Sequence, residues 1–402
     1  MNQTQSPIQI PASFLICAAA LLVTGAALAV AIMSGARVLP VEVEVTRVVL
    51  AEVPRQVEVI HTVEVTRQVE VIRQVEVTRE VEVTRLVPAP VIYQGASMSV
   101  ERAWPAAARL ADGRVLIAGG SRNGDDFLAQ AEIYDPAARS FTPAAPMNTP
   151  RHEHTAVALA DGRLLVIGGY NAGDTWLADA EVYDPARNTW TVVLPLYEHG
   201  VQHTATRLPD GDVLIIGGAV GSGLCTDQAE IFDPASLTWR ALPPMPTARA
   251  SHTATLLPDG LVLVAGGDSC QDSPPPDALL FDPRNETWTE TGPMVEAVRQ
   301  HGAALLPGGR VLVAGGLLNR ELPEASATAA AQIYNPASDS WSAAAPAARP
   351  RYNFALTALL DGRVVMAGGA DEWDQTWNDD SFVREVELFT PSTGSWEVIG
   401  EL

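Results

Sequence analysis

Residues 161–169 read DGRLLVIGG, and close variants of this stretch stand at five other places along the chain. The Asp-Gly step favours a tight hairpin turn, and the apolar run after it is typical of a buried strand. The glycine pairs that end these runs are Gly119–Gly120, Gly168–Gly169, Gly217–Gly218, Gly266–Gly267, Gly315–Gly316 and Gly368–Gly369. Their spacing is 49 residues four times and then 53, so one unit occurs six times.

Each unit contains four short apolar segments. One precedes the turn, as in HTAVAL (154–159), and the next is the run that ends at the glycine pair. A third, such as EVYDP (181–185), follows a loop, and the fourth surrounds an aromatic residue. Those aromatic residues are Phe141, Trp190, Trp239, Trp288, Trp341 and Trp396. Four strands per unit without a helical pattern predict the blades of an all-β, six-bladed propeller.

The glycine pair, the aromatic residue five or six positions after the Pro of the third strand, and the repeat length resemble the kelch repeat. The resemblance covers residues 98–402, within a predicted propeller domain of 91–402. It implies a six-bladed kelch β-propeller of the galactose-oxidase-like superfamily, of a membrane-anchored bacterial type. It also implies that the first strand of each blade lines the central channel and that the aromatic strand is outermost.

The N-terminal region predicts a membrane anchor. After a tail of residues 1–11 without Lys or Arg, residues 12–34 read ASFLICAAALLVTGAALAVAIMS and carry no charge. A helix over these 23 residues is long enough to span a hydrocarbon core of about 30 Å. The uncharged tail and the long apolar core favour an uncleaved transmembrane signal anchor. The Ala-rich end leaves cleavage, and therefore secretion, as the alternative.

Residues 35–90 predict a repetitive stalk. Positions 57–86 read VEVIHT VEVTRQ VEVIRQ VEVTRE VEVTRL, and this alternation favours extended or β structure over a coiled coil. Fully extended, residues 41–86 would reach on the order of 150 Å. The stalk is either a charged spacer or a segment that pairs with copies of itself into a homo-oligomer. Such runs resemble those that follow the export signal or anchor of some bacterial surface proteins, which predicts an extracytoplasmic propeller.

The charge balance excludes one class of partner. The chain has 26 Lys and Arg against 48 Asp and Glu, a formal net charge of −22. Nucleic-acid binding needs a basic surface, and the sequence shows none. The acidity fits a soluble surface whose charges repel one another.

The cysteines predict a disulfide rather than a metal site. There are three, without CxxC or Cys/His zinc spacing, and Cys17 lies in the apolar N-terminal run. Cys225 and Cys270 follow the glycine pairs of neighbouring units, in equivalent loops on one face of the propeller. Such loops can approach to the Cα separation of about 4.4–6.8 Å that a disulfide needs. A Cys225–Cys270 bond would imply an oxidising compartment.

Two sets of recurrent side chains stand where the chain enters each innermost strand. The first is His154, His203, His252 and His301. Recurrence in four units favours a structural role, a blade-to-blade hydrogen bond or packing, over a metal site. The second set is Arg102, Arg151, Arg249 and Arg351, three residues earlier. The structural interpretation applies here too, but in kelch relatives arginines in this loop often contact acidic ligands, so a binding role is the alternative.

The non-recurrent residues are the stronger candidates for binding. The loop of the sixth unit contains Asp371, Glu372, Trp373, Asp374, Trp377, Asp379 and Asp380. Trp beside carboxylates suits sugar recognition, clustered carboxylates equally suit Ca²⁺, and an acidic loop that buries its own Trp is the structural alternative. Trp104 and Trp176 lie near the same predicted face, and Tyr352 stands beside an innermost strand.

The sequence as a whole favours a non-enzymatic binding module. A membrane-tethered propeller on a stalk would recognise a glycan, a peptide or a protein partner, and no catalytic residue is assigned. The alternative is a galactose-oxidase-like or other carbohydrate-active enzyme on the propeller axis. The resemblance would then require an adjacent Tyr-His pair as copper ligands, but here Tyr197 and His199 are separated by one residue, which argues against copper.

Overall fold

The computed structural model describes residues 44–53, 56–64, 97–122, 126–171, 175–270, 277–318, 326–371 and 382–401. The chain divides into two units, Met1–Pro88 and Ala89–Leu402. The predicted anchor at 12–34 lies outside the described residues. Within the described ranges, no helix has the length and hydropathy needed to cross a membrane.

The first unit contains one antiparallel hairpin within the predicted stalk. Strand β1 (Glu44–Val53) pairs with β2 (Gln56–Glu64), for example Val49 opposite Ile60. The prediction of β structure agrees with this hairpin. Because the two Val-rich segments pair with each other, residues 44–64 fold back rather than run as one extended segment.

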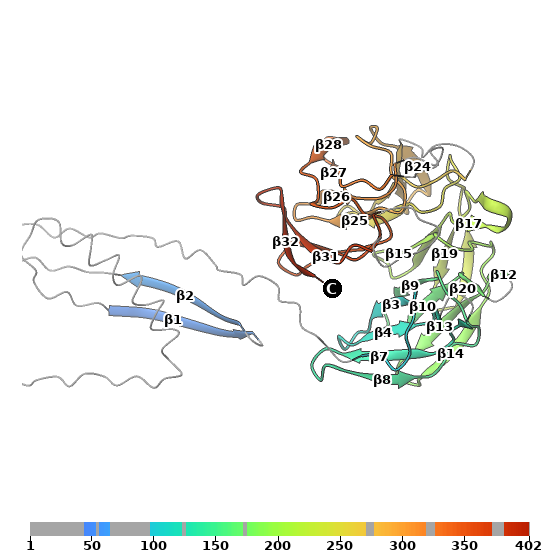
Figure 1. Cartoon of the computed structure of the whole chain (residues 1–402), viewed down its shortest axis with the longest axis horizontal. Coiled ribbons are helices and arrows are strands. Elements are labelled where there is room, and N and C mark those ends of the chain that lie inside the picture. The colour runs from blue at the N-terminus through green and yellow to red at the C-terminus, as the bar shows by residue number, and fades with distance from the viewer. Residues whose placement is uncertain are drawn as a thin grey trace, which may run out of the picture. The chain divides into compact units, whose positions relative to one another are not determined.

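The second unit is a ring of six four-stranded antiparallel sheets, each ordered from the inner to the outer strand as in the sequence (Figure 1). Blades one to three contain β3 (Ala106–Arg109), β4 (Val115–Ala118), β7 (Ala131–Asp135), β8 (Ser140–Ala144); β9 (Thr155–Ala158), β10 (Leu164–Ile167), β13 (Ala180–Asp184), β14 (Thr189–Val193); and β15 (Thr204–Arg207), β16 (Val213–Ile216), β19 (Ala229–Asp233), β20 (Thr238–Ala241). Blades four to six contain β21 (Thr253–Leu256), β22 (Val262–Ala265), β23 (Ala278–Asp282), β24 (Thr287–Glu290); β25 (Gly302–Leu305), β26 (Val311–Ala314), β27 (Ala331–Asn335), β28 (Ser340–Ala344); and β29 (Ala355–Ala358), β30 (Val364–Ala367), β31 (Glu385–Thr390), β32 (Ser395–Glu401). The prediction of six blades is confirmed.

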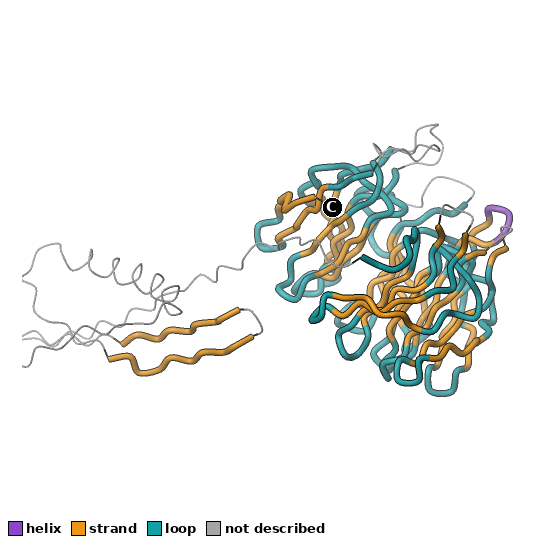
Figure 2. The backbone as a smooth tube through the Cα atoms, turned by 60° about the horizontal axis from the view of Figure 1, so that its bottom comes forward, coloured by secondary structure: helices purple, strands orange, loops and turns teal. Residues whose placement is uncertain are grey.

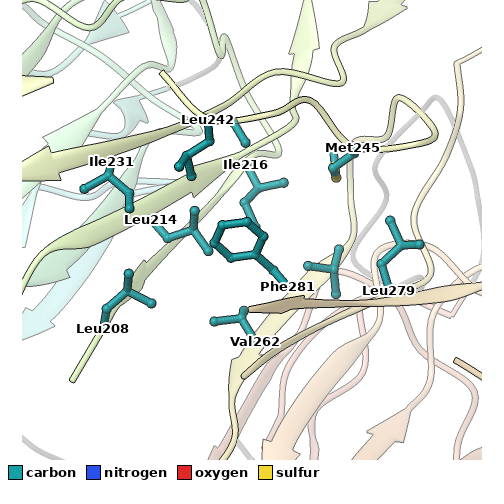
Figure 3. Close-up of a cluster of buried hydrophobic side chains, with 11 residues drawn as sticks. Leu208, Leu214, Ile216, Ile231, Leu242, Met245, Val262, Leu279 and Phe281 are labelled. Atoms are coloured by element: carbon teal, nitrogen blue, oxygen red, sulfur yellow. The ribbon is translucent and has the colours of Figure 1, made fainter. Parts of the chain in front are cut away.

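The hydrophobic core lies in the seams between neighbouring blades. In the seam of blades three and four, Leu214 and Ile216 pack against Val262 and Phe281, and all four are buried (Figure 3). Phe281 also stacks on Trp288 of the outer strand, with ring centroids 4.7 Å apart. Equivalent clusters fill the seams one–two, two–three, four–five and five–six. The second strand of each of blades two to five is therefore buried on both faces.

The seam between blades six and one is packed less closely. Inner strands of neighbouring blades lie side by side in the other five seams, whereas β29 and β3 make no comparable approach. Figure 2 shows the short strands of the propeller and the loops that connect them. Val115 and Ile117 of blade one and Val365 and Ala367 of blade six are only half-buried, whereas their equivalents in the other seams are buried.

Each glycine pair of the first five blades stands where the next blade comes closest. The Gly169 N–H donates to the Gly200 carbonyl at 2.7 Å, and Gly120, Gly218, Gly267 and Gly316 make the same bond to the following blade. Gly168 has φ +62°, and a Cβ there would lie 2.3 Å from the Gly200 carbonyl oxygen and 3.0 Å from His203. Only glycine combines this conformation with this approach.

The recurrent histidines fill the other side of this contact. All four are buried, and the Nε2 atoms of His252 and His301 are 2.9 Å from the hydroxyls of Thr204 and Thr253 on the preceding blade. Burial lowers the pKa of His154 and His203 to about 3 and that of His301 to about 4. The rings are therefore neutral members of the seam, as the packing interpretation predicted.

The recurrent arginines hold each blade to the segment that enters it. Arg151 is fully buried; its Nη1 donates to the Gly168 carbonyl at 2.8 Å, and its Nη2 lies 3.0 Å from Glu181 Oε1. Glu181 also accepts the backbone N–H groups of Asn148 at 2.8 Å and Thr149 at 3.0 Å. The equivalent pairs are Arg102–Glu132 and Arg351–Glu387, whereas Arg249 pairs with Asp277, two positions earlier, where Asp179 stands in blade two. Blade three keeps the carboxylate but replaces the arginine by a histidine, since His199 Nε2 lies 2.9 Å from Glu230 Oε1.

We expect Glu181→Ala to lower the free energy of unfolding by about 2–3 kcal/mol, because Arg151 keeps only Asp179 as a charged partner and the Asn148 and Thr149 N–H groups lose their acceptor. The measurement is urea denaturation of the full chain. Arg187→Ala is the control, since it breaks an ion pair with Asp184 whose arginine is 78% exposed. That change should cost less than about 0.5 kcal/mol. Equal losses in the two variants would contradict the structural role of the buried pair.

We also expect stability to fall as the pH drops from 6.5 towards 4. In this window the unfolded chain protonates its histidines, whereas the buried rings of His154, His203 and His301 stay neutral because their folded-state pKa is lowered. The unfolded state then binds more protons, so each such histidine should cost about 1 kcal/mol per pH unit. Urea denaturation of His154→Phe, which copies Phe354 at the same position in blade six, should show a shallower pH dependence; an unchanged slope would contradict this.

Candidate functional site

One end of the ring, here called the loop face, gathers the segments that differ between blades. In every blade, the residue two positions after the first glycine of the pair forms an isolated β-bridge with the segment that enters the inner strand. The loop after the glycine pair and this entering segment therefore lie at the same end of the blade. The bridges are Ala103–Ser121, His152–Tyr170, Val201–Ala219, Ala250–Asp268, Arg299–Leu317 and Tyr352–Ala370. Short hairpins extend this end in blades one to three: β5 (Ser121–Arg122) with β6 (Asp126–Phe127), β11 (Tyr170–Asn171) with β12 (Thr175–Trp176), and β17 (Ala219–Val220) with β18 (Leu224–Cys225), the last two strands joined by the 3₁₀ turn η2 (Gly221–Gly223).

A ring of six residues surrounds the loop-face end of the inner strands. This mouth ring consists of Trp104, Glu153, Gln202, Ser251, Gln300 and Asn353, with φ between 51° and 59°. Backbone bonds join its members from blade to blade: Ser251 N–H to the Gln202 carbonyl at 2.9 Å and Gln300 N–H to the Ser251 carbonyl at 3.0 Å. Asn353 N–H continues the series to the Gln300 carbonyl at 3.2 Å.

The mouth ring repeats its backbone but not its side chains. A left-handed conformation costs a non-glycine residue roughly 1–2 kcal/mol, and glycine would avoid this cost. None of the six positions holds glycine, and five different residue types occupy them. The Oε1 atom of Gln300 is buried without a hydrogen-bond partner. The turns before the outer strands share this conformation at Arg139, Asn188, Leu237, Glu286 and Asp339, so what distinguishes the mouth ring is its place among the variable loops of the loop face.

Aromatic rings run across the loop face from blade one to blade two. Trp104, 40% exposed, meets the edge of His152 at a centroid distance of 5.8 Å. His152 lies between Phe127 at 4.7 Å and Tyr170 at 4.0 Å. Tyr170 in turn contacts Trp176 at 5.7 Å. The structure thus brings the two predicted tryptophans, Trp104 and Trp176, to the two ends of one aromatic row.

A pocket of about 250 Å³ lies at the end of this row, between blades two and three. It is lined by Glu153, Tyr170, Trp176, Val201, Gln202 and Ala219. Burial raises the pKa of Glu153 above its ordinary value. This pocket could not be predicted from the sequence, because its lining comes from segments of two blades that are far apart in the chain.

The predicted arginine sites are placed in the scaffold. Arg102, Arg151, Arg249 and Arg351 have fully buried side chains engaged with the carboxylates described above. The alternative of a binding role predicted an accessible guanidinium at the channel, whereas each of these groups turns into its own blade. A Glu recurs in the third strand of blades one, two, three and six, and its need for a buried partner could have predicted where the arginine side chains lie. The same Glu could have predicted the contact between His199 and Glu230 in blade three.

The remaining predicted residues fall into three groups. Tyr352 is 1% exposed in a cluster with Leu317 and Ala370. Asp371 lies 2.7 Å from Arg349 in an ion pair. The rest of the sixth-blade loop lies outside the described residues: Glu372, Trp373, Asp374, Trp377, Asp379 and Asp380. Nothing in the described structure bears on their predicted sugar or Ca²⁺ site.

The two propeller cysteines form a disulfide on the loop face. Cys225 ends the hairpin of blade three and Cys270 stands in the equivalent loop of blade four, with Cα atoms 5.4 Å apart. The Cys270 N–H donates to Asp268 Oδ1 at 2.9 Å, which fixes the approach of this loop. The bond links two loops 45 residues apart in sequence.

In the described part of the chain, no three His, Cys, Asp or Glu side chains are grouped so that they could hold a metal ion. The four recurrent histidines are buried in the blade seams. His199, considered above beside Tyr197, uses both ring nitrogens: Nε2 lies 2.9 Å from Glu230 Oε1 and Nδ1 lies 2.9 Å from the Gly217 carbonyl.

Comparison with solved structures agrees with the fold. YjhT superimposes with a TM-score of 0.58 at 15% identity, over 75% of this chain and 98% of its own. A fungal alcohol oxidase of the AA5 family, solved in complex with copper, gives 0.55 at 19% identity over 67% of this chain. This chain spans 58% of that oxidase. With its nitrogens already bonded, His199 does not fit a copper ligand, and at these identities the likeness shows the fold alone.

Sequence comparison is more specific. No curated protein matches the chain. The Kelch motif family matches three segments, residues 105–148, 150–195 and 204–246, which together with their connections cover blades one to three. The same glycine pairs and strand order continue through blades four to six. Residues 105–246 therefore contain three Kelch motifs, in a chain whose six repeats form a β-propeller.

Proposed function

We propose that this chain is an interaction protein whose propeller binds a partner protein through the loop face. The N-terminal segment anchors it in a membrane, and the stalk displays the propeller outside the cell. Three features support display: the uncharged run at 12–34, the repetitive segment at 35–90, and the Cys225–Cys270 disulfide, which fits an oxidising compartment.

The mouth ring is the observation that carries this proposal. The side chains of the recurrent histidines and arginines are buried and serve the scaffold. In the mouth ring only the backbone conformation recurs, and most blades place a different residue type at this position. Variable side chains on a rigid frame are how loop surfaces usually achieve recognition. Kelch motifs are typical of protein-interaction modules, which favours a protein as the partner.

A glycan is the second candidate ligand. The half-buried Trp176 and the 40% exposed Trp104 offer ring faces on which a sugar could stack. If the ligand is a glycan, Trp373 and Trp377 of the sixth-blade loop supply further rings for stacking, and the carboxylates of that loop bind sugar hydroxyl groups or Ca²⁺. A glycan array probed with the full chain, with and without Ca²⁺, distinguishes this candidate from a protein partner.

We expect the double variant Gln300→Gly/Asn353→Gly to lose partner binding without losing stability. Glycine keeps the left-handed backbone of the mouth ring and removes two of its side chains. The measurement is quantitative crosslinking and mass spectrometry of the full chain in its native membrane, where the yield of the main partner should fall at least tenfold. The free energy of unfolding should stay equal or rise.

Arg139→Gly/Glu286→Gly is the matched control. Both residues also have positive φ, 53° and 56°, but they lie in turns before outer strands, at the opposite end of the blades. This variant should retain the wild-type partner yield. Partner binding that survives the mouth-ring variant, or that is lost equally in the control, would contradict the proposal.

For the display outside the cell, we expect Cys225 and Cys270 to resist alkylation in intact cells until a reductant is added. Mass spectrometry of tryptic peptides should find the two linked when cells are lysed in the presence of a thiol-blocking reagent. Cys225→Ser/Cys270→Ser should lose about 3–4 kcal/mol of stability, the typical contribution of a bond that closes a loop of this length. Two free thiols in freshly lysed cells would contradict an oxidising location.

A further inference from the structure

We infer that the pocket between blades two and three binds a cationic side chain, lysine or arginine, of the partner protein. This inference rests on the proposed function of the loop face. It specifies the chemistry of one contact there and predicts that the partner presents a basic segment to this acidic chain.

The dimensions and walls of the pocket suit one amino-acid side chain. Its volume of about 250 Å³ lies below the roughly 300–1,000 Å³ of sites for drug-sized molecules. Tyr170 and Trp176 form an aromatic wall, with ring centroids 5.7 Å apart and planes inclined by 33°. Val201 and Ala219 add apolar surface from blade three. The methylene stem of a lysine or arginine would lie along such walls, and its charge would meet the aromatic faces favourably.

Glu153 supplies the charge at this pocket. Its carboxylate is half-buried, and no ion pair joins it to another residue of the described part of the chain. By contrast, the loop-face carboxylates Asp126, Asp179, Asp268 and Asp371 each lie within 4 Å of an arginine. Burial alone raises the pKa of Glu153, so its charge is poorly solvated where it stands. A bound cation would restore the interactions that burial removes.

Blade three is altered where it receives Trp176. In four blades the position of Gly200 holds the buried arginine, but here the partner of the carboxylate is His199, one residue earlier. Gly200 has φ +55°, and a Cβ there would lie 2.0 Å from the Ala219 carbonyl oxygen and 2.8 Å from Trp176 Cε3, so both the backbone and the indole require glycine at this position. The scaffold contact to Glu230 is kept while space is made for the indole, which is the larger counterpart of Phe127 in blade one. This change has a reason if Trp176 belongs to a binding site.

Charge favours a basic over an acidic partner. The chain has a net charge of −22, and the recurrent arginines that would attract an acidic ligand are buried and paired. The pocket lining contains one carboxylate and no cationic residue. An acidic side chain would meet Glu153 across a poorly solvated space, which opposes binding.

The test is a saturation-transfer NMR titration of the full chain in detergent with four probes. They are the N-acetyl amides of lysine, arginine, norleucine and glutamate. At least one cationic probe should bind ten times more tightly than norleucine and glutamate, and added NaCl should weaken it. Glu153→Gln should weaken that probe at least tenfold and remove the preference, and Trp176→Leu should weaken it as well.

Glu290→Gln is the matched control, because it removes an exposed carboxylate on the outer strand β24 and should change the affinity less than twofold. Urea denaturation checks that each variant is folded. A cationic probe that binds no better than norleucine, or that binds folded Glu153→Gln as well as wild type, would overturn the inference. Partner crosslinking separates the two proposals: loss in the mouth-ring variant with retention in Glu153→Gln overturns only this inference, whereas retention in the mouth-ring variant overturns the proposed function.

Discussion

The close approach of each glycine pair to the next blade is the constraint on which the ring depends. Gly169 donates its N–H to a carbonyl of blade three, and the absent side chain of Gly168 leaves room for the His203 ring. The pair thus determines how near two blades can stand and which ring fills the space between them. The glycine pair of one blade and the recurrent histidine of the next blade form the two sides of a single contact. With the blade positions so determined, the apolar second strands can be buried on both faces.

The buried ion pairs add a second level of order, and their variation is instructive. Arg151 and Glu181 tie the outer strand of one blade to the body of the next. Blade three achieves the same with His199, and blade five uses the amide of Gln332, which bonds to the backbone of Val295 and Glu296. The chemistry changes, yet the backbone groups remain satisfied. A scaffold with such tolerance can give up individual positions, such as that of Gly200, to recognition.

Sequence periodicity was sufficient to predict the blades, because each strand and turn depends on residues within one repeat. The Cys225–Cys270 pairing followed from the same equivalence of loops in neighbouring repeats. The positions of the arginine side chains did not follow from the repeat, because an arginine that enters the channel and one that turns into the blade would recur with the same sequence spacing. The pocket beside Trp176 could not be predicted from the sequence either, because its walls come from two blades. Pairing of β1 with β2 was missed because every Val-rich hexad offers a similar partner.

The half-buried seam between blades six and one has a mechanical consequence. Blade one follows the N-terminal segment along the chain, so a pull transmitted from that side reaches it first. One of its flanks, with Val115 and Ile117, is packed less closely than either flank of blades two to five. Under load the ring would open at this seam and release blades in the order of the chain, each step resisted by one glycine contact and one apolar seam. A propeller built in this way would yield stepwise rather than all at once.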